Sequence, residues 1–514
     1  MNPNIPTSNI NTSTTTSSKQ EPKGYVIYNA NVYTSDNKIP RIDSFTVLNG
    51  KFIDIGSQTD LLKKWNNLQH LLGLGDILTS VNLSNTRSIE DVIEQVKKYI
   101  QLHPDDTNEW VTGFGWNQEL WQSKEFPTSK DLDSDPQLNK YPIALTRIDG
   151  HAMWVNEKVL NILGKDKIPE NIDGGEIGRN KLTNELTGIF VDNAMELVFD
   201  KMLSPTDDKL LNRLRAAIHE MHSNGLTGIH DASVPPKYID FYKRTIKNNP
   251  EEFNIRVYAM VECDRNKYCG DQVERIDEFG EGRLTVRSVK LFMDGALGSW
   301  GAALLEPYSG DQANNIIINA YEKCFQDYIK LHSNDEEKKI LTEEELLRQV
   351  KNLAEKLRFR IEHAQILTLD DIKRVGELKI IPSMQPTHGS ERIKGAYAWL
   401  KVFPLSSDFP VESVNPFLGF YAAITRKWKN GDSPHGKDGW FPSQKLTREE
   451  ALRGFTIDAA YAGFSEDTMG SISIGKYADF VILDRDIMQT SEEKIIDTKV
   501  LSTIFAGKVK MILI

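Results

Sequence analysis

The chain has 514 residues, of which 39% are hydrophobic and 26% are charged, and its formal net charge is -11 at pH 7. This length and composition predict a globular protein of two or three domains. The acidic balance excludes nucleic acid as the main partner, because no basic stripe is available to neutralise phosphates. Since no apolar run is long enough to cross a bilayer, we expect no membrane partner either.

Two features of the sequence bear on the cellular location of the protein. The three cysteines, Cys263, Cys269 and Cys324, are too few and too scattered for a disulfide framework, which favours a reducing, cytoplasmic setting. Residues 1–22 are dominated by Asn, Ser and Thr, and we predict a disordered tail, because such a segment buries too little apolar surface. The tail has neither the apolar core of a secretory signal nor the arginines of a transit peptide.

The two ends of the chain share a β-like texture. Residues 23–66 contain short apolar runs separated by turns, including a hairpin signal at Asn49-Gly50. Residues 466–514 contain three further strand-like runs, with a turn at 506–508. We therefore expect one small β-sandwich domain built from both chain ends.

The middle region, residues 68–465, alternates between helical and strand-like patterns. Helical spacing of apolar residues occurs at 89–102, 209–223 and 342–357. Strand-like runs lie at 144–146, 228–230, 255–259 and 380–384. This alternation predicts an α/β fold with a parallel sheet, for which a (β/α)8 TIM barrel is the simplest closed form. A doubly wound sheet is the alternative, although no Gly-rich nucleotide loop follows any strand.

Three polar side chains stand where apolar runs give way to loops. Lys290, His363 and Asp408 each occupy such a position, in three separate segments. Parallel α/β proteins deliver catalytic side chains from the carboxyl ends of their strands, so we expect the three to share one site. His363 and Asp408 can bind a metal as they stand, and Lys290 can do so after carbamylation.

Each of these residues also has a structural interpretation. A lone lysine at a strand end is often an ion-pair partner, and a lone histidine on a strand is often a hydrogen-bonded core residue. An aspartate before a loop is often a turn former, whereas in a hydrolytic metal site it binds the ion and takes a proton from water. Because Glu362 and His363 alternate along a strand, only one of them can face inward, and we favour His363.

Polar and aromatic segments elsewhere can line a pocket or simply pack. Trp116, His151, Trp154 and His388 lie in such segments, and Asp294 follows Lys290 in the next loop. We assign Trp116, His151, Asp294 and His388 to the substrate side of the predicted site. His230 and Asp231, at another strand end, are expected to be structural.

Taken together, the motifs resemble the YtcJ-like branch of the amidohydrolase superfamily (amidohydrolase family 3), which includes N-substituted formamide deformylases. The resemblance runs from about residue 25 to the end of the chain. The segments that carry it, in colinear order, are 147–152, 289–299, 305–308, 360–367, 383–388, 407–412, 446–452 and 475–480.

The resemblance implies a distorted (β/α)8 barrel beside a β-sandwich, and metal-dependent hydrolysis of a non-peptide carbon–nitrogen bond in a small amide-like substrate. Lys290 would be a carbamylated bridge, and His70 and His363 would be metal ligands. Asp408 would be both ligand and general base. His151 and His388 would face the substrate. The implied cofactor is one or two divalent ions, for which zinc is the favoured identity. The protein partner that we consider is a second copy of the chain in a homodimer.

The sequence departs from the family pattern on the strands that should bear ligands. The first strand of the family ends in an H-x-H motif, but Leu68 replaces the first histidine, and His70 matches the second. The family's H-A-I-G-D segment is cut to 310–314 without its histidine, and the strand before Asp408 is short. We therefore expect an incomplete barrel that lacks its first strand.

These departures leave two other hypotheses open. One is a catalytically impaired scaffold that acts as a binding protein, because an underfilled ligand shell holds its ion weakly. The other is an activity on a nucleobase-like ring, for which Trp116 and Trp154 offer stacking surfaces.

Overall fold

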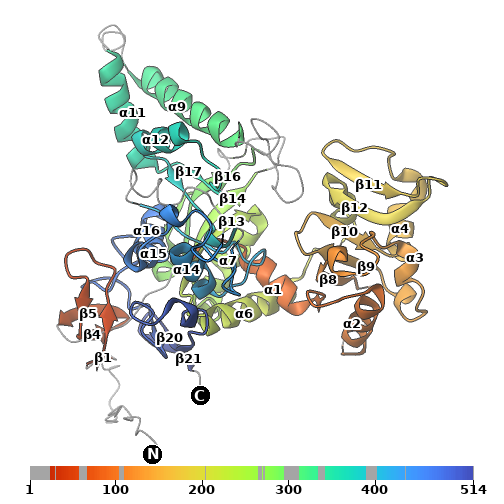
Figure 1. Cartoon of the computed structure of the whole chain (residues 1–514), viewed down its shortest axis with the longest axis horizontal. Coiled ribbons are helices and arrows are strands. Elements are labelled where there is room, and N and C mark those ends of the chain that lie inside the picture. The colour runs from red at the N-terminus through yellow and green to blue at the C-terminus, as the bar shows by residue number, and fades with distance from the viewer. Residues whose placement is uncertain are drawn as a thin grey trace, which may run out of the picture.

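The computed structural model describes residues 24–28, 30–56, 66–102, 109–202, 204–263, 269, 273–293, 312–333, 342–388, 402–433 and 436–512. Two arcs of parallel strands form its centre (Figure 1). The strands of the first arc run in the order β6, β13, β14, β16, and all four are parallel. They are β6 (Asn66–Gln69), β13 (Gly228–Val234), β14 (Arg256–Glu262) and β16 (Leu284–Lys290), with β15 (Ile276–Glu278) antiparallel at the edge.

The second arc is shorter. Strand β17 (Arg360–Ile361) pairs in parallel with β18 (Ile381–Pro382), and a parallel bridge from Met384 to Leu405 extends the arc by one further segment. The arcs meet where the backbone N–H of His70 donates to the carbonyl of Phe409 over 3.2 Å. Between Lys290 and Arg360 the described residues contain no strand, so this side of the ring is open among them.

Strand β6 corrects one expectation. The four residues 66–69 pair in parallel with β13, so a first strand is present, and the barrel begins at Asn66 rather than at residue 68. Because these residues contain no apolar run, the sequence pattern did not predict a strand here. Their extended conformation comes from pairing with β13.

Helices cover the outside of the two arcs, except the helix at 89–102, which packs on a second sheet described below (Figure 1). The predicted helices at 89–102 and 342–357 are confirmed as α2 (Ile89–Leu102) and α11 (Glu343–Leu357), the latter capped by the Thr342 hydroxyl, which accepts from the N–H of Glu345. The other long helices are α1 (Leu71–Thr79), α6 (Asp207–Ser223), α7 (Pro236–Asn248), α9 (Gln312–His332), α12 (Leu369–Glu377) and α14 (Pro416–Thr425). No helix in the described part of the chain is long and apolar enough to span a membrane.

A second, six-stranded sheet forms a lobe of its own at the right of Figure 1. It includes the segment 144–146, which we had assigned to the barrel. Its strand partners decide this placement, because residues 144–146 pair with 112–114 and 153–155 and not with the parallel arcs. The strands, in sheet order, are β11 (Gly175–Arg179), β12 (Leu186–Asp192), β10 (Ala152–Val155), β9 (Ile143–Arg147), β8 (Val111–Trp116) and β7 (Val81–Asn82).

The two chain ends pack together. Phe45 and Phe52 from the N-terminal sheet meet Phe480 from the C-terminal sheet, with ring centroids of Phe45 and Phe480 5.1 Å apart. A bridge between Lys51 and Tyr477 joins the two segments directly. The strands are β1 (Gly24–Ile27), β4 (Ser44–Leu48) and β5 (Lys51–Gly56) in one sheet, and β19 (Phe480–Leu483), β20 (Val500–Phe505) and β21 (Lys508–Ile512) in the other.

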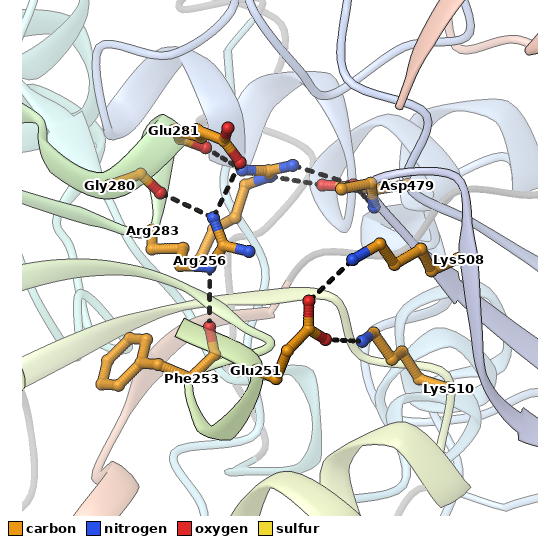
Figure 2. A network of polar contacts seen from close by, with 10 residues as sticks. Glu251, Phe253, Arg256, Gly280, Glu281, Arg283, Asp479, Lys508 and Lys510 are labelled. Atoms are coloured by element: carbon orange, nitrogen blue, oxygen red, sulfur yellow. Dashed lines mark hydrogen bonds and ion pairs between the residues drawn. The ribbon is translucent and has the colours of Figure 1, made fainter. Parts of the chain in front are cut away.

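A buried ion pair fastens the C-terminal sheet to the base of the parallel strands (Figure 2). Arg256, the first residue of β14, donates to both carboxylate oxygens of Asp479, and its Nη1 donates to the carbonyl of Glu281 over 2.7 Å. The guanidinium lies 3.9 Å from the centre of the Tyr477 ring. Every charge in this cluster has a partner, so the network is a structural joint.

The cysteines need a further correction. Cys263, directly after β14, is disulfide-bonded to Cys269, with Cα atoms 5.4 Å apart, and Cys324 is free and exposed on α9. The two residues lie close enough in the structure to form the bond, which their spacing in the sequence does not reveal.

Candidate functional site

Four of the predicted side chains gather at the carboxyl ends of the parallel strands. His70 directly follows β6, Lys290 is the last residue of β16, and His363 lies two residues beyond β17. Asp408 lies in the turn after the segment that pairs with Met384. Since parallel strands end at one edge, their last residues are brought to the same mouth.

Asp408 stands between the two histidines. Its Oδ1 is 3.7 Å from His70 Nε2, and its Oδ2 is 3.9 Å from His363 Nδ1. The Asp408 side chain is only 7% exposed, whereas those of His70 and His363 are 38% and 41% exposed. Oδ1 of Asp408 is buried without a hydrogen-bond partner among the described residues. A buried carboxylate oxygen in this state is unusual and is free to bind a further group.

The electrostatics of the mouth place Lys290 with these residues. Burial raises the pKa of Asp408 to about 8, although the charge of Lys290 opposes this rise. Burial also lowers the pKa of Lys290, against the influence of Glu362 and Asp408. The pKa of His70 falls to about 4 through burial and the charge of Lys290. His70 is therefore neutral at pH 7, the form in which imidazole binds metals.

Asp231 holds His70 in place. Its Oδ1 accepts from the N–H of Leu71 over 3.2 Å, at the start of α1, and its Oδ2 accepts from the hydroxyl of Tyr242 over 2.9 Å. Burial raises the pKa of Asp231 to about 7. The carboxyl thus anchors the residue next to His70, in agreement with the structural role expected from the sequence.

Glu362 is a residue of the mouth that the sequence-based argument set aside. Strand β17 ends at Ile361, so Glu362 and His363 lie in a turn, where the alternation of strand faces no longer applies. His363 adopts a φ of 56°, and Glu362 is buried and accepts from Arg360 Nε over 2.6 Å. Arg360 Nη1 also lies 2.8 Å from His230 Nδ1. The sequence feature that could have identified Glu362 as a site residue is its position directly before His363 in the same motif.

Gln385 is a second residue that the prediction missed. Its Oε1 lies 3.1 Å from His363 Nδ1, and its Nε2 donates to Ser406 Oγ over 2.8 Å. It therefore fixes the orientation of the His363 ring from the neighbouring strand. Partners of this kind set which ring nitrogen is available to a ligand.

The imidazole and carboxylate groups at the mouth are of the types that bind a divalent ion. One pair of these groups also has the spacing that two ligands of one ion require. Two ligands of a tetrahedral zinc ion lie roughly 3.4 Å apart, given bonds of about 2.1 Å. The 3.7 Å between His70 and Asp408 is close to this value. Within the described ranges, however, no three or more His, Cys, Asp or Glu side chains are arranged to hold an ion. The residues present therefore match one ion better than two.

The residues predicted to contact substrate have different fates. Trp116 is fully buried beside Trp121 and Trp154, and its indole N–H donates to the carbonyl of Leu145 over 2.8 Å. It is a core residue of the six-stranded sheet, which corrects the prediction that it lines a pocket. The aromatic spacing of this segment reflects packing instead.

The other three residues predicted to face the substrate are His151, Asp294 and His388. Among the described residues, no contact links them to the mouth. His151 lies on the six-stranded sheet, with Nδ1 2.6 Å from Asp192 Oδ1. His388 ends a short 3-10 helix, η8 (Pro386–His388), but its side chain is outside the described residues, as is all of Asp294.

Comparisons with known proteins identify the family of this chain. A profile described as the amidohydrolase family matches residues 69–510. "Protein LONG AFTER FAR-RED 3" of Arabidopsis thaliana is 27% identical, covering 94% of this chain and 91% of that protein. "Putative amidohydrolase YtcJ" of Bacillus subtilis (strain 168) is also 27% identical, over 86% of each chain. The resemblance to the YtcJ-like branch is thereby confirmed.

A solved structure supports the fold. The crystal structure of an uncharacterized metal-dependent hydrolase from Pyrococcus horikoshii OT3 matches with a TM-score of 0.68 and 23% identity, covering 91% of this chain and 99% of that one. At this identity the likeness concerns the fold alone, and it supports a TIM-barrel-like α/β architecture.

Proposed function

Because this chain belongs to the amidohydrolase family, we propose that it hydrolyses a non-peptide carbon–nitrogen bond of the amide or formamide type. The observation that carries the proposal is the position of Asp408 between two imidazoles, next to a buried lysine. Titratable groups with strongly shifted pKa values, gathered at one mouth of a barrel, are typical of an active site.

A divalent ion, zinc in this proposal, would be held first by His70 and Asp408, the pair whose spacing suits it, and His363 would complete the set. The ion would lower the pKa of water towards ~7. Lys290 would join the ligands after carbamylation. In that step its neutral amine nitrogen forms a bond to the carbon of CO2, one C=O π bond opens, and the proton that the nitrogen loses passes to solvent water. Burial lowers the pKa of Lys290 and so increases the fraction of neutral amine that this step requires.

Asp408 acts as the general base. Burial, the main cause, raises the pKa of its carboxyl to about 8 in the metal-free chain, so that the ionised carboxylate is a stronger base than that of an exposed aspartate. The base takes a proton from the attacking water and returns it to the leaving nitrogen. Gln385 and Asp231 act as positioning residues, through His363 and through the start of α1, respectively.

The test combines metal content with product analysis. The full chain, reconstituted with zinc, should retain about one ion per chain and release formate from N-benzylformamide. His363→Asn should lose both metal and activity, whereas His332→Asn, on the exposed end of α9, serves as the matched control. Ammonia release from aromatic amines, measured in parallel, tests activity on nucleobase-like rings.

Two results would contradict the proposal. One is a purified protein that retains no zinc and releases no formate, which would favour the impaired scaffold instead. The other is formate release that persists unchanged in His363→Asn, because the reaction would then come from another site or from a contaminant.

A further inference from the structure

A cavity of about 300 Å³ adjoins the candidate site, and no residue assigned above to metal or base lines it. Thr387 in its wall lies two residues after Gln385, which contacts His363. Glu412, also in the lining, follows Asp408 by four residues, and its charge raises the pKa of Asp408. The cavity thus begins where the candidate site ends.

The lining is positively charged. Arg426, Lys427 and Lys429 contribute three cations, and Glu412 is the single acidic residue lining it. Lys429 acts on Glu412, whose pKa it lowers against the effect of burial. Because the chain as a whole carries a formal charge of -11, a basic cavity runs against the overall composition. Such local charge attracts an anionic group.

The backbone that carries these cations is held by hydrogen bonds, and Arg426 is also bonded through its side chain. Arg426 is 4% exposed, and its Nε donates to the backbone carbonyl of Trp440 over 3.1 Å. The N–H of Lys427 donates to the hydroxyl of Thr425 over 3.2 Å. These bonds fix the backbone turn from which the three cations project, which lowers the entropic cost of binding a ligand there.

Two tryptophans give the cavity flat walls. Trp428 is 57% exposed, although its backbone is fixed in a turn by bonds with Gly431 and Asp432. Trp440 contributes the second ring. Thr387 Oγ1 is buried without a hydrogen-bond partner among the described residues. A large exposed aromatic ring beside cations and an available hydroxyl suits a flat group that ends in a polar charge.

We propose that this cavity binds the non-reacting arm of the substrate, and that this arm is a flat apolar group carrying a carboxylate. The inference rests on the proposed hydrolase function and specifies its substrate class. The carboxylate would lie near Arg426 and Lys427, and the apolar part would stack on Trp428. Glu412 disfavours a second negative charge, so a singly charged carboxylate fits better than a phosphate dianion.

Binding of a matched pair of probes tests the proposal. Titration calorimetry on the full-length, zinc-free chain would compare indole-3-propionate with its neutral analogue indole-3-propionamide. We expect the carboxylate to bind about tenfold more tightly, in line with one charge-assisted contact. The double variant Lys427→Gln/Lys429→Gln should lose this preference, and Trp428→Ala should weaken both probes.

The control is Lys323→Gln/Lys330→Gln, which makes the same change of two charges on the exposed face of α9 and should keep the full preference. Equal binding of the two probes, binding of neither, or an unchanged preference in the double variant would overturn the inference. Formate release from N-benzylformamide is scored separately. If the protein releases no formate but clearly prefers the carboxylate probe, the hydrolase proposal is contradicted, whereas the assignment of the cavity as a carboxylate-binding site is retained.

Discussion

The two ends of the parallel strands carry the same kinds of charged residue in opposite states of pairing. At the base, Arg256 and Asp479 are buried and share two hydrogen bonds, and further bonds and aromatic rings complete their surroundings. At the mouth, Asp408 is buried with one oxygen that lacks a hydrogen-bond partner among the described residues, and its pKa is raised to about 8. The base therefore stabilises the fold, and the mouth is prepared for a ligand.

The contrast predicts opposite outcomes for similar substitutions. Removing a charge from a satisfied buried network leaves its partner without compensation, which is costly. Removing a charge that is itself poorly satisfied relieves a cost of burial. Substitutions at the base should therefore change stability, and those at the mouth should change activity.

The largest effect is expected for Asp408→Asn. The amide cannot serve as a base, so formate release from N-benzylformamide should fall by about 10²–10⁴-fold. In the zinc-free protein, urea unfolding should show stability equal to or above that of the parent chain, because burial of the carboxylate no longer costs free energy. Asp327→Asn, exposed on α9, is the control. A marked loss of stability in Asp408→Asn would contradict the contrast between the mouth and the base, because it would show that the Asp408 carboxylate stabilises the fold.

Asp479→Ala should have the next largest effect, at the other end of the strands. It leaves the buried guanidinium of Arg256 without its carboxylate, and the free energy of unfolding should fall by about 3–5 kcal/mol. Urea denaturation measures this loss. Asp277→Ala, which removes an exposed partner of Arg275, should cost less than ~1 kcal/mol. Similar costs for the two variants would contradict the role of the joint.

Asp231→Asn should change how stability depends on pH. The pKa of Asp231 is about 7 in the folded protein and near 3.8 when unfolded, so the folded state binds this proton more tightly. Its contribution is full below pH ~4 and is lost as the pH rises through ~7. Asn keeps an acceptor for Leu71 and a donor for Tyr242, so the variant should lose less stability between pH 5 and 8. An unchanged slope of urea midpoint against pH would refute this.

Glu251→Gln should have the smallest effect. Glu251 pairs with Lys508 and Lys510 at 2.6 and 3.1 Å, and these contacts lower its pKa to about 2. Its contribution is present above pH ~4.5 and fades as the pH falls towards 2. Because the pair is exposed, we expect a loss below ~1 kcal/mol at pH 7 that vanishes at pH 2 and in high salt. A pH-independent loss would point to packing instead.

The sequence determined which residues reach the mouth. Lys290, His363 and Asp408 end apolar runs, and this local pattern predicts side chains delivered from strand ends. The apolar periodicity of α2 and α11 was equally local, and the β texture of both chain ends predicted the strands that pack together there. Such signals survive without knowledge of the partners, because they depend on neighbours within a few residues.

Tertiary structure decided the rest. Strand β6 exists because β13 is beside it, and Trp116 is a core residue because the six-stranded sheet closes around it. The disulfide bond between Cys263 and Cys269 was equally invisible in their sequence spacing. The bonds of Asp231 and the basic cavity likewise join residues distant in the chain. Pairing, burial and charge at a site depend on which segments meet in space, and the linear pattern does not contain that information.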